Sequence, residues 1–517
     1  MVSAVLFITF FVLLVLNVPI AVCLGLSSAA AILYSGTSLT IVATNIYSGI
    51  SKFLLLAIPF FVLSGNIMAK AGISTRLIRF VDTCVGHRKG GIANVCIIVA
   101  CFFGAISGSG PATVAALGAV LIPAMVERGG FSAAFSTALM ATSSSIAIVI
   151  PPSIAFVVYA SITGVSIGDM FMAGIIPGIL MGLALVVVVM LEVRRNHVVP
   201  SNVEKASAKE RWNAFKDAFW GFLMPIIILG GIYGGFFTPT EAAAVSVVYG
   251  LFVGMVIYKE VKFKDLWEIL IDSAKTTGGI MLIVACASLF SFVCTRFGIS
   301  TAASELLARV AGNQFTFLLI CNIIFLIAGC FIDANSAMYI FIPIMLPVCK
   351  ALGYNVIAFG IMATVNLAIG QVTPPVGVNL FVAIGIKLRD GIRVTLQEIS
   401  RAVVPMVAAS IAVLLIITYI PQISTCLPAA LGSAAAIEND ETVGGDSGTT
   451  QTDNDDFNTI GDYSDLDWAD MTWNFTCSTT ETSTWAQAGR KFGELMEQAT
   501  GGKVKVDVYA ADQLTGG

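Results

Sequence analysis

Long apolar segments alternate with short polar ones along the chain as far as residue 421. A helix needs about 20 apolar residues to cross the roughly 30 Å hydrocarbon core of a bilayer. Shorter apolar pieces flank polar, Gly- or Pro-rich breaks, and we interpret them as hairpin arms or half-helices. The pattern predicts an all-α polytopic membrane protein. The segments long enough to cross are 3–33, 53–70, 92–106, 170–191, 217–237, 241–258, 276–295, 315–332 and 402–421, and the shorter ones are 111–126, 132–150, 153–163, 336–349, 355–369 and 376–386.

The same residues recur in two halves of the chain, about 226 positions apart, with the offset slipping to 222 and 223 in the last matches. Five matches in the same order are unlikely to arise by chance. Two repeated halves with interrupted apolar segments are the best sequence sign of a secondary transporter whose site lies between the repeats. The pairs are Gly72-Ile73-Ser74-Thr75 with Gly298-Ile299-Ser300-Thr301, Gly86 with Gly312, Ser107-Gly108-Ser109-Gly110 with Asp333-Ala334-Asn335-Ser336, Met140-Ala141-Thr142 with Met362-Ala363-Thr364, and Pro151-Pro152 with Pro374-Pro375.

Composition supports a membrane protein. Hydrophobic residues make up 57% of the chain and charged ones 12%, with a mean hydropathy of +0.90, whereas about a quarter of the residues in soluble domains are charged. The acidic residues are concentrated after residue 437, and no basic patch suits nucleic acid. Nine of the 11 cysteines lie in or beside apolar helices without metal-ligand spacing, so we expect small buried hydrophobes. The N-terminal segment lacks the features of a signal peptide and is expected to be one retained helix, which Asn17-Val18-Pro19 could break.

Basic residues in short loops predict which loops face the cytoplasm. Loop 70–91 carries five Lys or Arg and its counterpart 296–312 two, whereas 160–169 carries none and its counterpart 386–401 four. Corresponding loops are therefore expected on opposite sides of the membrane, as in an inverted-topology repeat. The basic links 192–217 and 259–275, two crossings apart, should both be cytoplasmic. The last apolar segment then leads outward and places the acidic tail on the periplasmic or extracellular side.

The polar breaks mark the candidate site, because an unpaired backbone group in hydrocarbon costs several kcal/mol unless protein or a solvated cavity satisfies it. Carbonyls freed there, with Ser, Thr and Asn oxygens, suit Na⁺, and half-helix N-termini suit an anion. A single Gly-Ser break can equally be a packing kink, but two copies in inverted halves favour a site. The breaks are 104–111 and 142–152 in the first half, and 329–336 and 366–375 in the second.

Individual residues in these breaks allow different interpretations. Asp333 is the only carboxylate deep in a break, so it is a candidate functional acid, with a helix cap as the alternative. Ser107 and Ser109 stand beside glycines, but His87 and His197 fall in basic loops, so a serine protease is not supported. The chain has no Walker-type phosphate loop. We expect a protein that is not an enzyme and has no cofactor beyond Na⁺ as coupling ion.

Four segments together resemble the large membrane subunit of the tripartite ATP-independent periplasmic (TRAP) transporters, the DctM family. The resemblance covers about 1–423 and implies an elevator transporter with two re-entrant hairpins, driven by a Na⁺ gradient. It also implies two partners, a small four-helix membrane subunit (DctQ-like) and a periplasmic binding protein (DctP-like) that delivers an organic acid. The segments are Ala57-Ile58-Pro59-Phe60-Phe61-Val62-Leu63-Ser64-Gly65, Gly104–Gly118, Phe237-Thr238-Pro239-Thr240-Glu241-Ala242-Ala243-Ala244 and Thr373-Pro374-Pro375-Val376-Gly377-Val378-Asn379.

The resemblance, carried over by position, implies two Na⁺ sites. One uses the first hairpin tip around Ser107 and Gly110 with carbonyls near Gly329 and Ile332. Ser109 and Asp333, in the same breaks, are further candidate cation ligands. The second site uses Gly370, Thr373 and Val376, and the substrate is expected between the tips, near Ser143, Ser144, Asn335, Asn366 and Asn379.

The C-terminal residues 471–517 depart from that family and look like the first strand, helix and second strand of a DctP-like binding protein. The apolar spacing from Trp485 to Met496 suits a helix, and Val504-Val506-Val508 alternates as a strand does. The piece is too short to close around a ligand, so we interpret it as truncated. The stretch 433–470 is typical of a disordered linker.

We therefore expect Na⁺-coupled import of an organic acid, such as a C4-dicarboxylate, a sialic or other sugar acid or a keto acid, across the bacterial inner membrane. One alternative is a stand-alone anion or Na⁺/H⁺ carrier of a related inverted-repeat fold, which needs no partners. A membrane receptor would not explain polar breaks at membrane depth. The expected divisions are a scaffold helix and connector (1–52), the first repeat (53–191), a link with central scaffold helices (192–275), the second repeat (276–421), an acidic disordered linker (422–470) and the binding-protein-like segment (471–517).

Overall fold

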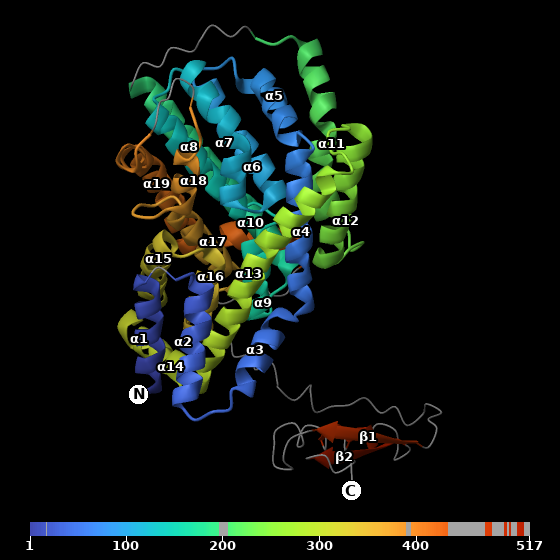
Figure 1. Ribbon diagram of the computed structural model, residues 1–517, viewed down its shortest axis with the longest axis vertical. Coiled ribbons are helices and arrows are strands. Elements are labelled where there is room, and N and C mark those ends of the chain that lie inside the picture. Colours follow the sequence, from blue (N-terminus) through green and yellow to red (C-terminus); the bar gives the residue numbers. More distant parts are fainter. Residues whose placement is uncertain are drawn as a thin grey trace, which may run out of the picture. The chain divides into compact units, whose positions relative to one another are not determined.

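The computed structural model describes residues 1–16, 18–195, 205–388, 394–432, 471–477, 491–493, 496–497 and 504–510. The chain divides into two compact units, Met1–Gly444 and Gly445–Gly517. The described part of the first unit is helical (Figure 1). Nine of its helices are long and apolar enough to cross a membrane. The chain is therefore a multi-pass membrane protein.

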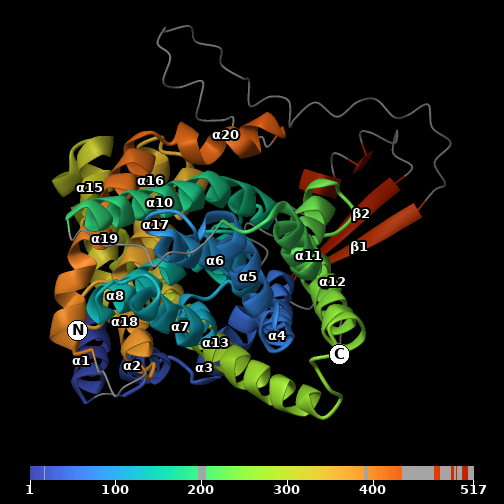
Figure 2. The ribbon, with the colours of Figure 1, turned by 90° about the horizontal axis from the view of Figure 1, so that it is seen from above.

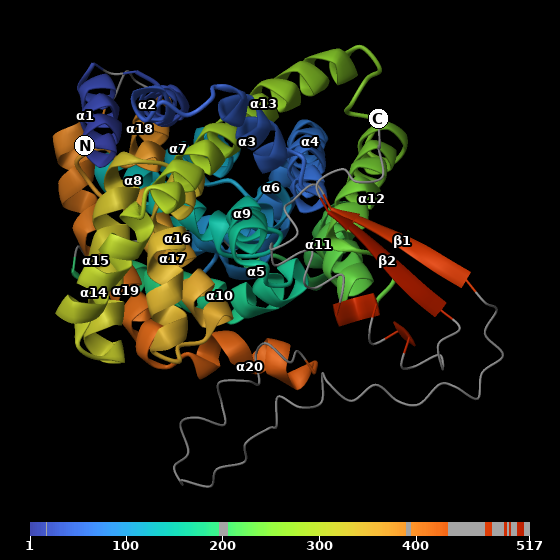
Figure 3. The same ribbon diagram turned by 90° about the horizontal axis from the view of Figure 1, so that it is seen from below.

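The N-terminal region forms three helices. Two of them cover the segment 3–33, so the break near Pro19 that the sequence left open is present and the segment is not one helix. Helix α1 (Val2–Val15) ends before Pro19, which is the N-cap of α2 (Ile20–Tyr34) and has no N–H to continue a helix. Helix α3 (Thr40–Ile50) follows. The long helix α13 (Asp265–Arg296) packs against α2 and α3, as Figure 3 also shows.

Four further helices flank the central bundle on another side. Helix α4 (Ala57–Lys70) continues a 3₁₀ turn at Phe53–Leu56 and packs against α12 (Pro239–Phe252). Helix α11 (Ala208–Tyr233) lies beside α12 and α5 (Ile73–Val85) (Figure 2). Helix α12 begins with a reciprocal capping box formed by Thr238 and Glu241.

Each half contains a helical hairpin that turns at a break in apolar sequence. In the first half, α6 (Gly91–Ser107) and α7 (Gly110–Glu127) are joined at Gly108, whose φ of 60° favours glycine. In the second half, α15 (Gln314–Phe331) and α16 (Ala334–Ala351) are joined at Ile332 and Asp333. The two predicted re-entrant hairpins are therefore present.

Each half also contains a helix broken where the double prolines lie. Proline cannot donate to the helical ladder, and the breaks fall at 149–153 and 371–377. A long helix closes each half. The elements are α8 (Ala133–Ser145), a 3₁₀ turn at Ile146–Ile148, α9 (Ile154–Thr163) and α10 (Ile167–Arg195) in the first half, and α17 (Val356–Gly370), α18 (Val378–Ile384) and α19 (Leu396–Tyr419) in the second.

The two halves are inverted with respect to each other. Helix α5 and its sequence counterpart α14 (Ile299–Ala311) lie at opposite ends of the first unit (Figure 1). Four ion pairs between nitrogen and oxygen atoms lie at the α5 end, and three of them join the basic segments 70–91, 192–217 and 259–275 to one another. Their strength is modest because most of the side chains are exposed, but they place these loops at one end, as the charge pattern predicts. The pairs are Arg76–Glu260 (2.6 Å), Arg128–Asp82 (2.9 Å), Lys70–Glu268 (3.2 Å) and Arg79–Asp217 (3.5 Å).

The expected linker begins too early at 422. Helix α20 (Gln422–Ala430) continues the first unit, packs on α10 and α17, and buries Ser424 and Pro428. Its apolar contacts explain why it is ordered. The stretch 433–470 lies outside the described residues.

The described strands of the second unit are β1 (Met471–Cys477) and β2 (Val504–Ala510), paired in parallel with Met471 opposite Val504. The predicted strand at Val504 is confirmed. The helix expected from Trp485 to Met496 lies mostly outside the described residues. A parallel pair requires a crossover connection of about a dozen residues or more, and the two strands are far enough apart in the sequence to allow one.

Candidate transport site

Each hairpin tip contacts the broken helix of its own half. A Cβ atom added at Gly104 would lie 2.7 Å from the Cα of Ala147, and one at Gly108 would lie 2.9 Å from the carbonyl oxygen of Pro152. In the second half, a Cβ at Gly370 would lie 2.5 Å from the Cα of Gly329. Only glycine permits this backbone approach. The repeated polar breaks therefore lie against one another within each half.

The first hairpin tip also reaches the broken helix of the second half. A Cβ added at Gly110 would lie 2.8 Å from Nδ2 of Asn379 and 3.0 Å from Oε1 of Gln371. Helix α18, which begins at this break, packs against α7 and α8. Residues far apart in the sequence thus meet at one buried point.

An incompletely satisfied amide cluster lies at that point. Asn379 Nδ2 donates to Ser144 Oγ at 3.2 Å and to the Ala141 carbonyl at 3.5 Å. Asn379 Oδ1 and Gln371 Oε1 are buried and have no partner among the described residues. A buried acceptor left unpaired costs about 1–3 kcal/mol. Such a pair of oxygens indicates a ligand that supplies donors or positive charge.

Sequence reasoning missed Gln371 as a site residue. It lies inside the break at 366–375, but only its proximity to Gly110 and Asn379 distinguishes it. The pair Ser144 and Asn379, expected near the substrate, is brought together. Ser143 is fully buried in α8.

The hydroxyl groups of the first tip bond to one another. Ser107 Oγ and Thr113 Oγ1 are 2.8 Å apart, and Thr113 Oγ1 donates to the Ser109 carbonyl at 2.8 Å. The side chain of Ser109, the N-cap of α7, makes no capping bond. The N–H groups of Gly110 and Ala112 at the start of α7 have no partner within the helix. This tip therefore offers donors to a ligand.

The three residues of the second expected Na⁺ site lie in or beside the helix break at 371–377, where Gly370 and Thr373 form a tight turn. Thr373 N donates to the Gly370 carbonyl at 3.0 Å, and Thr373 Oγ1 donates to the Ile369 carbonyl at 2.7 Å. Gly377 N donates to the Cys330 carbonyl of the second hairpin at 3.4 Å, which holds the turn containing Val376 against that hairpin. The Thr373 oxygen keeps its lone pairs for a cation.

At the second hairpin tip, Asp333 acts as a helix cap. Its carboxylate accepts hydrogen bonds from the N–H groups of Asn335 at 3.0 Å and Ser336 at 3.1 Å, and from the Ser336 hydroxyl. A carboxylate here also opposes the positive end of the helix dipole. Ile332 precedes this cap, and Oδ1 of Asn335 has no partner among the described residues. The cap is the alternative that the sequence left open for Asp333.

Asn366 belongs to a different polar cluster. Its Nδ2 donates to Asn322 Oδ1 at 2.6 Å and to the Met362 carbonyl at 2.9 Å. Asn322 in turn donates to Thr418 Oγ1 at 3.3 Å. These bonds tie α17 to α15 and α19, so Asn366 has a structural use that does not involve the Asn379 cluster.

Comparison with known proteins decides the family. The family model described as "Tripartite ATP-independent periplasmic transporter, DctM component" matches residues 7–423. The chain belongs to the DctM family of TRAP transporters. The C4-dicarboxylate TRAP transporter large permease protein DctM of Rhodobacter capsulatus is 38% identical over 436 residues, covering 81% of this chain and 97% of the relative.

Two further similarities extend the comparison. The sialic acid TRAP transporter large permease protein SiaM of Vibrio cholerae serotype O1 is 34% identical over 400 residues, covering 77% of this chain and 92% of the relative. The solved YdaH transporter of Alcanivorax borkumensis has a similar fold, with a TM-score of 0.54 and 15% identity over 76% of this chain and 88% of that one. The DctM match ends before the strands of the second unit.

Proposed function

We propose that this DctM-family chain imports a small organic acid together with Na⁺, as the translocating subunit of a TRAP system. The named relatives carry C4-dicarboxylates and sialic acid, and both substrates are carboxylates. The observation that carries the proposal is the pair of buried, unpaired oxygens of Gln371 and Asn379 beside Gly110. Both side chains belong to a helix break within the bundle.

The cation binds on the amide side of the site. Two carbonyl-type oxygens repel a carboxylate and attract a hard cation such as Na⁺, which prefers oxygen ligands. We therefore assign Gln371 and Asn379 to Na⁺ in addition to the turn that contains Gly370, Thr373 and Val376. Removing Na⁺ leaves these oxygens buried and unpaired, which couples ion binding to the stability of the closed site.

The carboxylate of the substrate binds at the start of α7. The free N–H groups of Gly110 and Ala112 and the positive end of the helix dipole favour an anion. At the start of α16 the carboxylate of Asp333 accepts from the N–H groups of Asn335 and Ser336 and would repel a second carboxylate. The substrate therefore lies closer to the first tip, next to Ser144 and Asn379.

The partners and the motion follow from the family. A small membrane subunit and a periplasmic binding protein complete the system, and the two hairpins with their broken helices move as one body past the flanking helices, as an elevator does. We assign the basic-loop end to the cytoplasm and the tail to the periplasm. The parallel strands β1 and β2 fit a fragment of a binding-protein-like βαβ unit.

Uptake into proteoliposomes tests this function. The chain is reconstituted with its small subunit and binding protein, and uptake of labelled C4-dicarboxylate and of labelled sialic acid is measured with an inward gradient of Na⁺ or of K⁺. We expect uptake of one acid with Na⁺ and with the binding protein present. Uptake by the chain alone would instead favour a stand-alone carrier, and equal uptake in K⁺ would contradict Na⁺ coupling.

A further inference from the structure

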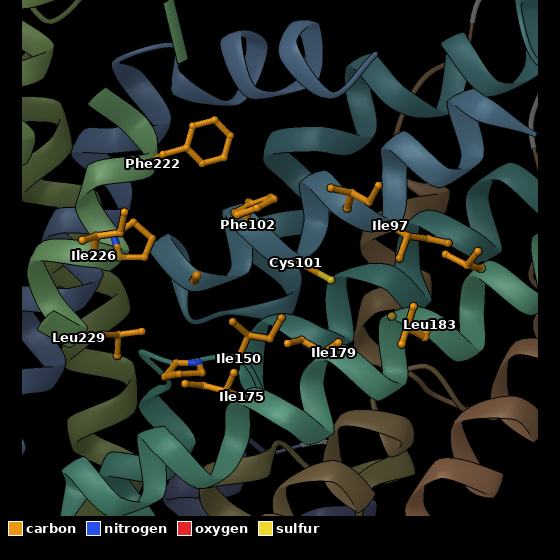
Figure 4. A pocket seen from close by; sticks show the side chains of 16 residues that line it. Ile97, Cys101, Phe102, Ile150, Ile175, Ile179, Leu183, Phe222, Ile226 and Leu229 are labelled. Carbon is orange, nitrogen blue, oxygen red and sulfur yellow. The ribbon is translucent and has the colours of Figure 1, made fainter. Parts of the chain in front are cut away.

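An apolar pocket lies where α6, α10 and α11 approach one another (Figure 4). Its volume of about 470 Å³ is within the range of small-molecule sites, about 300–1,000 Å³. Its wall also contains Ile150 and Pro151 from the first broken helix. None of the lining side chains is charged, and none is a Ser, Thr, Asn or Gln. The lining residues are Ile97, Ile98, Cys101, Phe102, Ala105, Ile150, Pro151, Ile175, Ile179, Gly182, Leu183, Val186, Phe222, Pro225, Ile226 and Leu229.

The pocket lies at the depth of the hydrocarbon core. On α10 the lining runs from Ile175 to Val186, roughly midway between Asp169 at one end of the helix and Arg195 at the other. Its rim is open, because Ile179, Leu183 and Ile226 are more than half exposed. Side chains exposed at this depth in a membrane-spanning helix face lipid. The mouth of the pocket therefore opens to acyl chains and not to water.

The chemistry of the pocket restricts its occupant. Apolar cavities without polar partners do not hold water, and a phospholipid headgroup finds no donor or charge here. An empty crevice forfeits dispersion contacts along its whole lining. We propose that the pocket binds one acyl chain of a membrane phospholipid, with the headgroup outside the pocket.

The position of the pocket gives the lipid a role in movement. Helix α10 packs on α6, α17 and α19, whereas α11 packs mainly on α5 and α12. The acyl chain thus fills the gap between the body that carries the first tip and a flanking helix. Lipid tails are as apolar as the lining, so binding gains packing contacts but little hydrophobic free energy. The bound acyl chain therefore exchanges readily with the surrounding bilayer. A lipid that exchanges readily allows the moving body to slide past the flanking helix α11. This role in movement rests on the proposed function.

Photo-crosslinking tests the site without relying on transport. The full complex is placed in vesicles of phosphatidylethanolamine and phosphatidylglycerol doped with a phosphatidylcholine that carries a diazirine in mid-chain, and the adducts are mapped by mass spectrometry. We expect adducts concentrated on the lining residues of α6, α10 and α11. Leu183→Trp and Ile179→Trp, which fill the mouth, should remove most of them. The control Val187→Trp, on the same helix and exposed but outside the pocket, should keep them.

Several results would overturn the proposal. Adducts spread evenly over exposed apolar positions of α10 such as Val187 would mean that lipid covers the surface without entering the pocket. Adducts that form when the protein is reconstituted by itself but not in the full complex would mean that the small subunit occupies the pocket. Adducts unchanged in both filled variants would also contradict it. If cross-linking supports the site but Leu183→Trp leaves the uptake rate unchanged, the role in movement is wrong while lipid binding stands.

Discussion

The two hairpin tips occupy equivalent places in the inverted halves but differ in how their helix starts are satisfied. At the first tip, Ser109 precedes α7 and its side chain caps nothing. At the second tip, Asp333 precedes α16 and its carboxylate takes the N–H groups of Asn335 and Ser336. Among the described residues, the start of α7 therefore receives no side-chain cap from its N-cap residue, whereas the start of α16 does. Under the proposed function, this difference leaves the first tip to the substrate carboxylate.

The largest effect is expected from crowding the first tip with Gly110→Ala. The new methyl would lie within 3.0 Å of Asn379 and Gln371 and displace their side-chain ends. We expect Na⁺-driven uptake to fall about tenfold or more, since each 1.4 kcal/mol of lost ligand binding is a factor of ten. Gly230→Ala is the control, because a Cβ there meets nothing within 4 Å. Equal uptake by the two variants would show that the first tip is not part of the transport site.

The next effect concerns the turn beside the second tip. Thr373→Val keeps the shape of the side chain and removes its oxygen, so we expect the half-saturating Na⁺ concentration to rise several-fold. The loss of one oxygen ligand costs about 1–2 kcal/mol. Thr364→Val removes a buried hydroxyl that bonds Gly360 within α17, and should leave the Na⁺ dependence unchanged. An unchanged Na⁺ titration for Thr373→Val would eliminate this turn as a Na⁺ site.

The capping role of Asp333 predicts a loss of stability. Asp333→Ala should lower the free energy of unfolding by about 0.5–2 kcal/mol, the usual cost of losing an N-cap, and Asp333→Asn should recover most of it. Unfolding in detergent micelles measures both. If Asp333→Asn keeps stability but abolishes the Na⁺ dependence of uptake, the carboxylate binds the cation and the comparison of the tips is wrong.

The smallest effect is expected at Ser109, the N-cap residue of α7 at the first tip. Ser109→Ala removes a side chain that makes no capping bond, so the free energy of unfolding should change by no more than about 0.5 kcal/mol. The same unfolding measurement applies. A loss as large as that of Asp333→Ala would show that the two tips are capped alike.

Much of the fold could be predicted from the sequence because its signals are local. Apolar length, double prolines and the Ser107-Gly108-Ser109-Gly110 break mark the helices, the breaks and the first tip. The distribution of Lys and Arg among corresponding loops indicates that the two halves are inverted relative to each other. At the N-terminal end, Asn17-Val18-Pro19 marked the place where the apolar run over 3–33 is broken. At the other end a local signal misled us, because the modest polarity of 422–430 hid the short helix α20.

The site itself could be predicted only in part. Ser144 and Asn379 come from different halves, and nothing in the sequence gives the register between halves. The resemblance placed both near the substrate, and only the structure shows that Asn379 donates to Ser144. Gln371 was missed for the same reason, because only contact across the halves distinguishes it. Asn366 has the residue type of a site residue, but its bond to Asn322 ties α17 to α15. Residue type and the positions of the helix breaks predict which segments form the site. The packing of the halves against each other decides which residues in those segments take part.

The Na⁺ dependence of uptake by Gln371→Leu tests the account most directly. The substitution deletes a buried acceptor that has no partner among the described residues, so it should not lower the thermal stability of the ion-free protein. We expect a clear rise in the half-saturating Na⁺ concentration, with unchanged affinity of the binding protein for its acid. Wild-type Na⁺ dependence in this variant would contradict the claim that the broken helices place their oxygens around the coupling ion.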